Sequence, residues 1–123
     1  MKILFDNGTP RSIARVLTGH EVTRARQIGW HELGNGELIQ SAEEAGYELL
    51  LSTDKNIRYQ QNLTGRKIAI VVLTDQQWPN VQLHLDLIAK VVNAAVSGSY
   101  VEVEIPRPLK KPVVTFNEPD LGG

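Results

Sequence analysis

The chain has 123 residues, of which 41% are hydrophobic and 22% charged, and its net charge of −1 gives an isoelectric point near 6.3. These values predict one globular domain with its own core, and they give no electrostatic argument for tight binding of nucleic acid. The chain has no cysteine, which excludes disulfides, thiolate metal sites and a cysteine nucleophile. The first apolar run is too short for a signal peptide and no run approaches the roughly 20 apolar residues of a membrane span, so we expect a cytoplasmic protein.

The first third of the chain predicts a strand, a helix and a second strand. Residues 2–6 are apolar without alternation, as in a strand that is covered on both faces. Thr9 is expected to cap a helix that has Pro10 in its first position. A short strand near a sheet edge is expected at residues 20–23.

The middle of the chain repeats this alternation. Asn35 is expected to cap a helix that ends at Gly46, and the apolar residues 47–53 predict a central strand. A short helix or turn with Ile57 and Tyr59 turned inward should follow at residues 54–62. The next strand, again apolar throughout, is expected at residues 68–73.

The last third predicts a long helix, an edge strand and a tail. Apolar residues recur at three- and four-residue steps over residues 80–96, as in a helix. A second apolar stripe is formed by Leu83, Leu87 and Val91. One sheet face cannot cover both stripes, so we expect a homodimer. Apolar and acidic residues alternate in the strand at 100–105, so residues 1–105 are expected to form the domain and residues 106–123 a proline-rich tail.

Three of the predicted strands run directly into an aspartate, namely Asp6, Asp54 and Asp75. Strands that alternate with helices predict an α/β fold with a mainly parallel sheet, whose strands all end at one edge. Ligands bind in the crevice at that edge. Clustered carboxylates repel one another unless a hard divalent cation lies between them, so the pattern indicates a metal site. Turn chemistry is an alternative explanation for Asp75.

The segments 1–10, 35–38 and 52–56 resemble, in their order and spacing, the PIN-like nuclease domains. The similarity is greatest to small bacterial stand-alone members suspected to be toxins of toxin–antitoxin pairs, and it covers roughly residues 1–97. The resemblance implies a PIN-like three-layer sandwich with a mainly parallel central sheet. In that family an acid often follows the first aspartate, another begins the second helix, and the third strand ends in a Thr-x-Asp-x-Asp-like run. Asp6 and Asp54 match this pattern, whereas the other acidic positions hold Asn7, Asn35 and Asn56.

The resemblance also implies a function. Asp6, Glu37 and Asp54 would hold Mg²⁺ or Mn²⁺ and form the catalytic centre of a ribonuclease, in which the metal activates a water and clamps the phosphate. The residues expected to bind the substrate are Asn7, Lys55, Asn56, Arg58 and Tyr59. The implied partners are RNA and an antitoxin protein.

Two other classes of function remain open. The asparagines lower the charge of the site, which favours a catalytically degenerate PIN-like module that binds nucleic acid or an antitoxin. A receiver-like phospho-accepting domain also places aspartates at strand ends, but the segment from Asp54 to Lys67 is short for the helix that such domains have there. In the structural alternative, Asp6 and Asp54 only cap turns and Glu37 only complements the dipole of its helix.

Overall fold

A five-stranded sheet, parallel throughout, forms the centre of the computed structural model, which describes residues 1–60 and 62–106. The strands are β1 (Lys2–Phe5), β2 (Glu21–Arg24), β3 (Leu49–Ser52), β4 (Ala69–Leu73) and β5 (Tyr100–Val103). Their order across the sheet is β2-β1-β3-β4-β5, so β2 and β5 are the edges. The predicted α/β class with a mainly parallel sheet is confirmed, and so are the predicted edge positions of the second and last strands.

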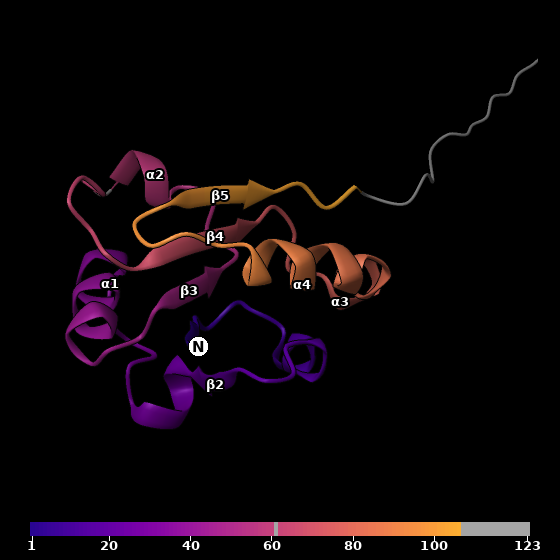
Figure 1. Cartoon of the computed structure of the whole chain (residues 1–123), viewed down its shortest axis with the longest axis horizontal. Helices are drawn as coiled ribbons and strands as arrows, with labels where there is room; N and C mark the ends of the chain where they lie inside the picture. The colour runs from indigo at the N-terminus through magenta and orange to yellow at the C-terminus, as the bar shows by residue number, and fades with distance from the viewer. Residues whose placement is uncertain (61, 107–123) are drawn as a thin grey trace, which may run out of the picture.

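Helices cover both faces of the sheet. Figure 1 shows α1 (Asn35–Glu44) and α2 (Ile57–Gln60) on one side, and α3 (Trp78–Val81) and α4 (Leu85–Asn93) on the other. The remaining turns are the 3-10 helices η1 (Arg11–Val16), η2 (Ala25–Ile28) and η3 (Gln82–His84). No helix in the described part of the chain has the length and apolar character needed to cross a membrane.

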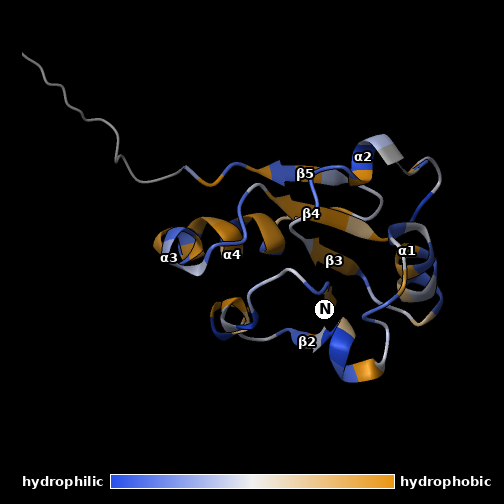
Figure 2. Cartoon of the chain, turned by 180° about the vertical axis from the view of Figure 1, so that it is seen from behind, coloured by the Kyte–Doolittle hydropathy of each residue, from blue (hydrophilic) through white to orange (hydrophobic). Residues whose placement is uncertain are grey.

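Alternate residues of each central strand belong to different cores. Leu4 and Leu50 pack with residues of α1, whereas Ile3 and Leu49 pack with residues of η1 and α4. Every residue of β3 and β4 is buried, which explains why their sequences are apolar without alternation. Figure 2 shows the same distribution, with hydrophobic central strands and hydrophilic residues on the edge strands β2 and β5.

Three local predictions were wrong. The first helix is a 3-10 turn whose N-cap is Pro10, because the Thr9 hydroxyl is used by Asp6 instead of the helix. The long helix predicted at residues 80–96 is interrupted by the 3-10 turn η3 and ends at Asn93. Tyr59 is 79% exposed instead of turned inward, although Ile57 is buried as expected.

The second apolar stripe of the C-terminal helical segment is largely uncovered. Leu83 is 64% exposed and Leu87 is 42% exposed, while Ile88 and Val92 on the other side are fully buried. A homodimer through this stripe stays a prediction. The predicted proline-rich tail lies outside the described residues, apart from Pro106.

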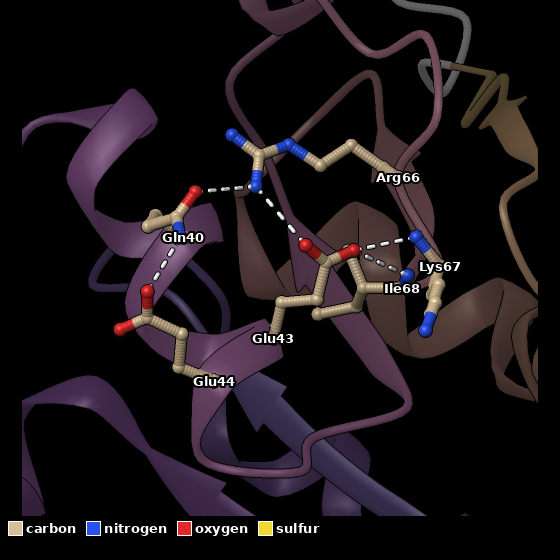
Figure 3. Close-up of polar contacts among 6 residues, drawn as sticks. All are labelled: Gln40, Glu43, Glu44, Arg66, Lys67 and Ile68. Carbon is tan, nitrogen blue, oxygen red and sulfur yellow. Dashed lines mark hydrogen bonds and ion pairs between the residues drawn. The ribbon is translucent and has the colours of Figure 1, made fainter.

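The Glu43 side chain joins α1 to the start of β4. Figure 3 shows its carboxylate accepting hydrogen bonds from the backbone N–H groups of Lys67 and Ile68 and from the guanidinium of Arg66. Burial raises the pKa of this carboxyl, but the N–H donors and the Arg66 charge together hold it below its ordinary value of 4.5. The ionised form of Glu43 therefore stabilises the fold.

Glu43→Gln is expected to lower the free energy of unfolding by about 1 kcal/mol at neutral pH, because an amide has one acceptor oxygen and no charge. A depressed carboxyl pKa contributes stability above its unfolded value, and this contribution is lost as the pH falls through the folded value. The difference from wild type in urea unfolding should therefore shrink in acid. Glu44→Gln is the matched control, since Glu44 is exposed and, within residues 1–60 and 62–106, its carboxylate accepts from Gln40 alone. Equal effects of the two changes would contradict the prediction.

Candidate functional site

Asp6 and Asp54 lie at the point where the connections of the sheet change direction. Asp6 follows β1 and Asp54 lies two residues beyond β3, and these strands are parallel neighbours. After β1 the chain continues to β2, toward one edge of the sheet. After β3 it continues to β4, toward the opposite edge. Ligand crevices of open α/β sheets form at such a switch point, outside the carboxyl ends of the strands. The prediction that the two carboxylates share one edge is confirmed.

The Asp6 side chain is held by hydroxyl groups. Its backbone N–H extends the β1–β3 pairing by donating to the carbonyl oxygen of Leu51 at 3.1 Å. The Thr9 hydroxyl lies 2.6 Å from Oδ1 of Asp6 and 2.9 Å from the carbonyl oxygen of Leu51. The Ser52 hydroxyl donates to Oδ2 of Asp6. Each oxygen of this carboxyl therefore has a partner inside the protein.

Ser52 connects the two aspartates. It is the last residue of β3 and is fully buried. Besides donating to Asp6, its hydroxyl oxygen accepts the backbone N–H of Asp54 at 3.0 Å. One side chain thus uses its single donor and an acceptor to bind the carboxylate of one aspartate and the backbone of the other.

Asn35 binds Asp54 across the crevice. Its amide nitrogen donates to Oδ2 of Asp54 at 2.7 Å, and Oδ1 of Asp54 accepts the backbone N–H of Asn56 at 2.9 Å. The predicted role of Asn35 as N-cap was wrong, because Asn35 is the first residue of α1 and Gly34 precedes it as the cap. We call Asp6, Thr9, Asn35, Ser52 and Asp54 the strand-end cluster.

Burial raises the pKa of the Asp6 carboxyl above its ordinary value of 3.8. The hydrogen bonds from the Ser52 and Thr9 hydroxyls and from the backbone N–H of Gly8 act in the opposite direction and do not offset the burial. The charge of Asp54 adds to the rise. Asp6 therefore gives up its proton less readily than a solvated aspartate.

The loops around the strand-end cluster are fitted closely to one another. A Cβ atom at Gly8 would lie 2.6 Å from Oγ1 of Thr53 and 2.8 Å from the side-chain oxygen of Gln76, so any larger residue there would force these two side chains to move. The amide of Asn7 donates to the backbone carbonyl of His31, which fastens the loop before α1 to the end of β1. Asn7 therefore has a structural partner in addition to its place beside Asp6.

The other predicted site residues lie around the crevice in different settings. Glu37 is exposed in the first turn of α1, and Lys55 and Asn56 are exposed beyond Asp54. Arg58 is directed elsewhere, since its guanidinium lies 3.9 Å from the Glu102 carboxylate and 5.2 Å from the centre of a tyrosine ring in β5. Arg58 therefore interacts with side chains of β5.

Asp75 has the turn role that was the alternative explanation for it. Its Oδ1 accepts the backbone N–H of Gln77 at 2.9 Å and its Oδ2 accepts from the amide of Asn80 at 2.7 Å. These bonds organise the entry into α3.

The donor set allows a test of the predicted Mg²⁺ or Mn²⁺. Carboxylate oxygens suit both ions. Within residues 1–60 and 62–106, however, no three His, Cys, Asp or Glu side chains form a group that could hold a metal ion, so Glu37 does not join Asp6 and Asp54. Asn35 turns its NH₂ group toward Asp54, and a donor group cannot bind a cation. These residues do not fit a divalent ion held by the protein alone.

Several residues at this edge were missed by the sequence analysis. Thr9 was assigned to a helix cap and Ser52 to the strand alone, although both hydroxyls bind Asp6. The arginines of η1, β2 and η2 were not considered as site residues. Arg24 and Arg26 line a small cleft together with Asp6. A signal was present in the sequence, because residues 7–31 contain four arginines and a single acid.

No protein-family model, curated protein or solved structure matches the chain. The fold and the site define a doubly wound α/β domain with a ligand crevice at the switch point between β1 and β3.

Proposed function

We propose that this chain is a non-catalytic PIN-like module that binds single-stranded RNA at the carboxyl-end edge of its sheet. The observation that carries the proposal is the hydrogen bond from the Asn35 amide to Asp54. The resemblance to PIN-like domains places an acid at the start of this helix, where two facing carboxylates would need a cation between them. Here the amide takes the place of both the acid and the cation, because it donates directly to Asp54.

Exposed residues that follow Asp54 in the chain support a nucleic-acid ligand. The ring of Tyr59 is 79% exposed on α2, and an exposed aromatic ring can stack on a base of any sequence. Lys55 is exposed between this ring and Asp54 in the chain and has no ion-pair partner among the residues that the structure describes. A receiver-like function gains no such support, since the helix that the described residues form between β3 and β4 is short, Ile57–Gln60.

The test is a binding and cleavage assay on fluorescently labelled single-stranded RNA, with EDTA or with Mn²⁺. The proposal predicts the same affinity in both buffers and intact RNA after prolonged incubation. Cleavage that requires Mn²⁺ and is abolished in both Asp6→Asn and Asp54→Asn would overturn it in favour of a metal-dependent ribonuclease. Absence of any RNA binding would overturn it as well.

Asn35→Asp is expected to lower the free energy of unfolding in EDTA by about 1 kcal/mol, because a hydrogen-bond donor is replaced by a second carboxylate facing Asp54. Millimolar Mn²⁺ should then raise the melting temperature of this variant and leave that of wild type unchanged. Asn62→Asp is the matched control, since the Asn62 oxygen accepts the N–H of Thr64 and aspartate can do the same. If Asn35→Asp shows no response to Mn²⁺, the amide is not what keeps the site free of metal.

A further inference from the structure

Arginines line a cleft between η1 and β2, beside the strand-end cluster. The cleft has a volume of about 400 Å³, and its polar lining consists of Arg11, Ser12, Arg15, Arg24 and Gln27. Arg24 also lines the small cleft that contains Asp6 and Asn7. The larger cleft, which we call the arginine cleft, therefore adjoins the crevice at the switch point.

The arginines of the arginine cleft carry positive charge that no ion pair within the described residues offsets. Among the described residues, Arg11, Arg15 and Arg24 have no acidic side chain within ion-pair distance. Glu21, the acid nearest to Arg24 in the sequence, begins β2 whereas Arg24 ends it, and three residues of a strand span about 10 Å. Asp6, the acid nearest to Arg11 in the sequence, lines the small cleft together with Arg24. Guanidinium groups gathered in this way repel one another, and a bound anion would relieve that repulsion.

Two other clefts of comparable size carry charges of both signs. A cleft of about 320 Å³ that includes Tyr47 is lined by Glu43, Glu48 and Lys67. A cleft of about 540 Å³ beside β5 is lined by Glu102, Glu104 and Lys55. Of these three clefts, the arginine cleft is the one whose charged lining is entirely positive, which favours an anionic chain there.

The residue type of the lining favours phosphate. A guanidinium presents a planar fork of N–H donors that matches two phosphate oxygens, and it keeps its charge at any physiological pH. The Arg15 guanidinium is already held in place, 5.5 Å from the centre of the Trp78 ring. Ser12 and Gln27 add uncharged hydrogen-bonding groups to the same lining.

We propose that the arginine cleft binds successive phosphates of the nucleic-acid backbone and leads the strand past Asp6 toward the exposed ring of Tyr59. The inference rests on the proposed RNA binding. It assigns the electrostatic attraction of the phosphates to arginines on the β2 side of the sheet. The sequence analysis had assigned that part to Lys55 and Arg58 on the other side. RNA and DNA share the phosphodiester chemistry that the cleft recognises, so the test uses both.

The test is the salt dependence of binding to a short oligouridine, measured by fluorescence anisotropy on the full chain with Arg11→Gln and Arg24→Gln combined. Each phosphate contact on a single strand contributes about −0.7 to the slope of log K against log salt, so the loss of two contacts should decrease the magnitude of this negative slope by about 1.4. At about 0.1 M salt this corresponds to a loss of affinity of roughly 25-fold. Oligodeoxyuridine should show the same decrease in slope, whatever its absolute affinity.

The matched control combines Lys67→Gln with Lys90→Gln, which removes two positive charges from exposed positions outside the arginine cleft. Both double variants should keep the melting temperature of wild type. The cleft proposal is overturned, and RNA binding stands, if the arginine variant binds like wild type or if the lysine variant loses as much slope. A wild-type protein that binds no RNA, or that binds poly-glutamate more tightly than RNA, overturns the cleft and the proposed function together.

Discussion

Ser52→Ala is expected to lower the free energy of unfolding by about 3 kcal/mol, which is the largest effect we predict for a single side chain in the crevice. The Ser52 hydroxyl is fully buried and has two partners, the Asp6 carboxylate and the backbone N–H of Asp54. Alanine leaves both partners without this bond in a site that water reaches poorly. A buried group that loses its partner costs about 1–3 kcal/mol, and more if it is charged.

Thermal and urea unfolding measure the effect. For a domain of this size, a loss of 3 kcal/mol should lower the melting temperature by roughly 10 °C or more. Thr53→Ala is the matched control, because it removes a hydroxyl from the next residue, whose hydrogen bond to Gln76 is long at 3.4 Å. A loss in Ser52→Ala no larger than in Thr53→Ala would show that Ser52 does not hold the two aspartates together.

The sheet could be predicted from the sequence because its central strands are buried on both faces. Runs such as 49–51 and 69–73 have no other stable place in a domain of this size than the middle of a parallel sheet. Polar residues directly after such runs then predicted the crevice, and Asp6 and Asp54 do share one edge. Order and register of the strands were not predictable, because they depend on how the helices pack.

The bonds inside the crevice could not be predicted for the same reason. Ser52 reaches Asp6 only because the register pairs Phe5 with Leu51, which places the two following residues side by side. Asparagine is favoured at the N-cap by local sequence, but the Asn35 side chain binds Asp54 across the crevice instead of capping the helix. Tertiary contacts, and not local preferences, thus determine which partners these side chains bind.

The arginine cleft was hidden by the overall charge. A net charge of −1 averages over all 123 residues, and it conceals the excess of arginine in residues 7–31. Arg11 and Arg24 are far apart in the sequence, and the connection from β1 to the parallel neighbour β2 brings them to one cleft. A net charge near zero excludes an anionic ligand only if no segment of the chain carries a local excess of positive charge.

Asp6→Asn is expected to raise the free energy of unfolding by between about 1 and 2 kcal/mol at mildly alkaline pH, since ionised Asp6 bears the cost of a buried charge. Asparagine resembles the protonated acid: its oxygen can accept from Ser52, and its NH₂ group can donate to Thr9. The Thr9 hydroxyl, which lies within hydrogen-bond distance of both Asp6 and Leu51, then donates to the Leu51 carbonyl. The Ser52 and Thr9 hydroxyls and the Leu51 carbonyl all keep a partner in this arrangement.

The gain from Asp6→Asn should depend on pH. Burial raises the pKa of Asp6 above 3.8, so between that value and the folded pKa the folded state holds a proton that the unfolded state has released. Wild-type stability therefore falls, relative to the variant, as the pH rises through this window, and the difference is complete above it. Below the window both proteins carry a neutral side chain at this position, and their melting temperatures should converge.

Asp75→Asn is the matched control for this substitution, at the end of β4. Both oxygens of Asp75 accept from N–H groups, those of Gln77 and Asn80. An amide at this position would place its NH₂ group against one of these N–H donors and should therefore destabilise the fold. Melting curves of both variants and of wild type, recorded from mildly acidic to mildly alkaline pH, decide the matter. A gain in Asp6→Asn that is the same at every pH, or a loss at alkaline pH, would contradict the assignment of Asp6 as the buried acid with a raised pKa.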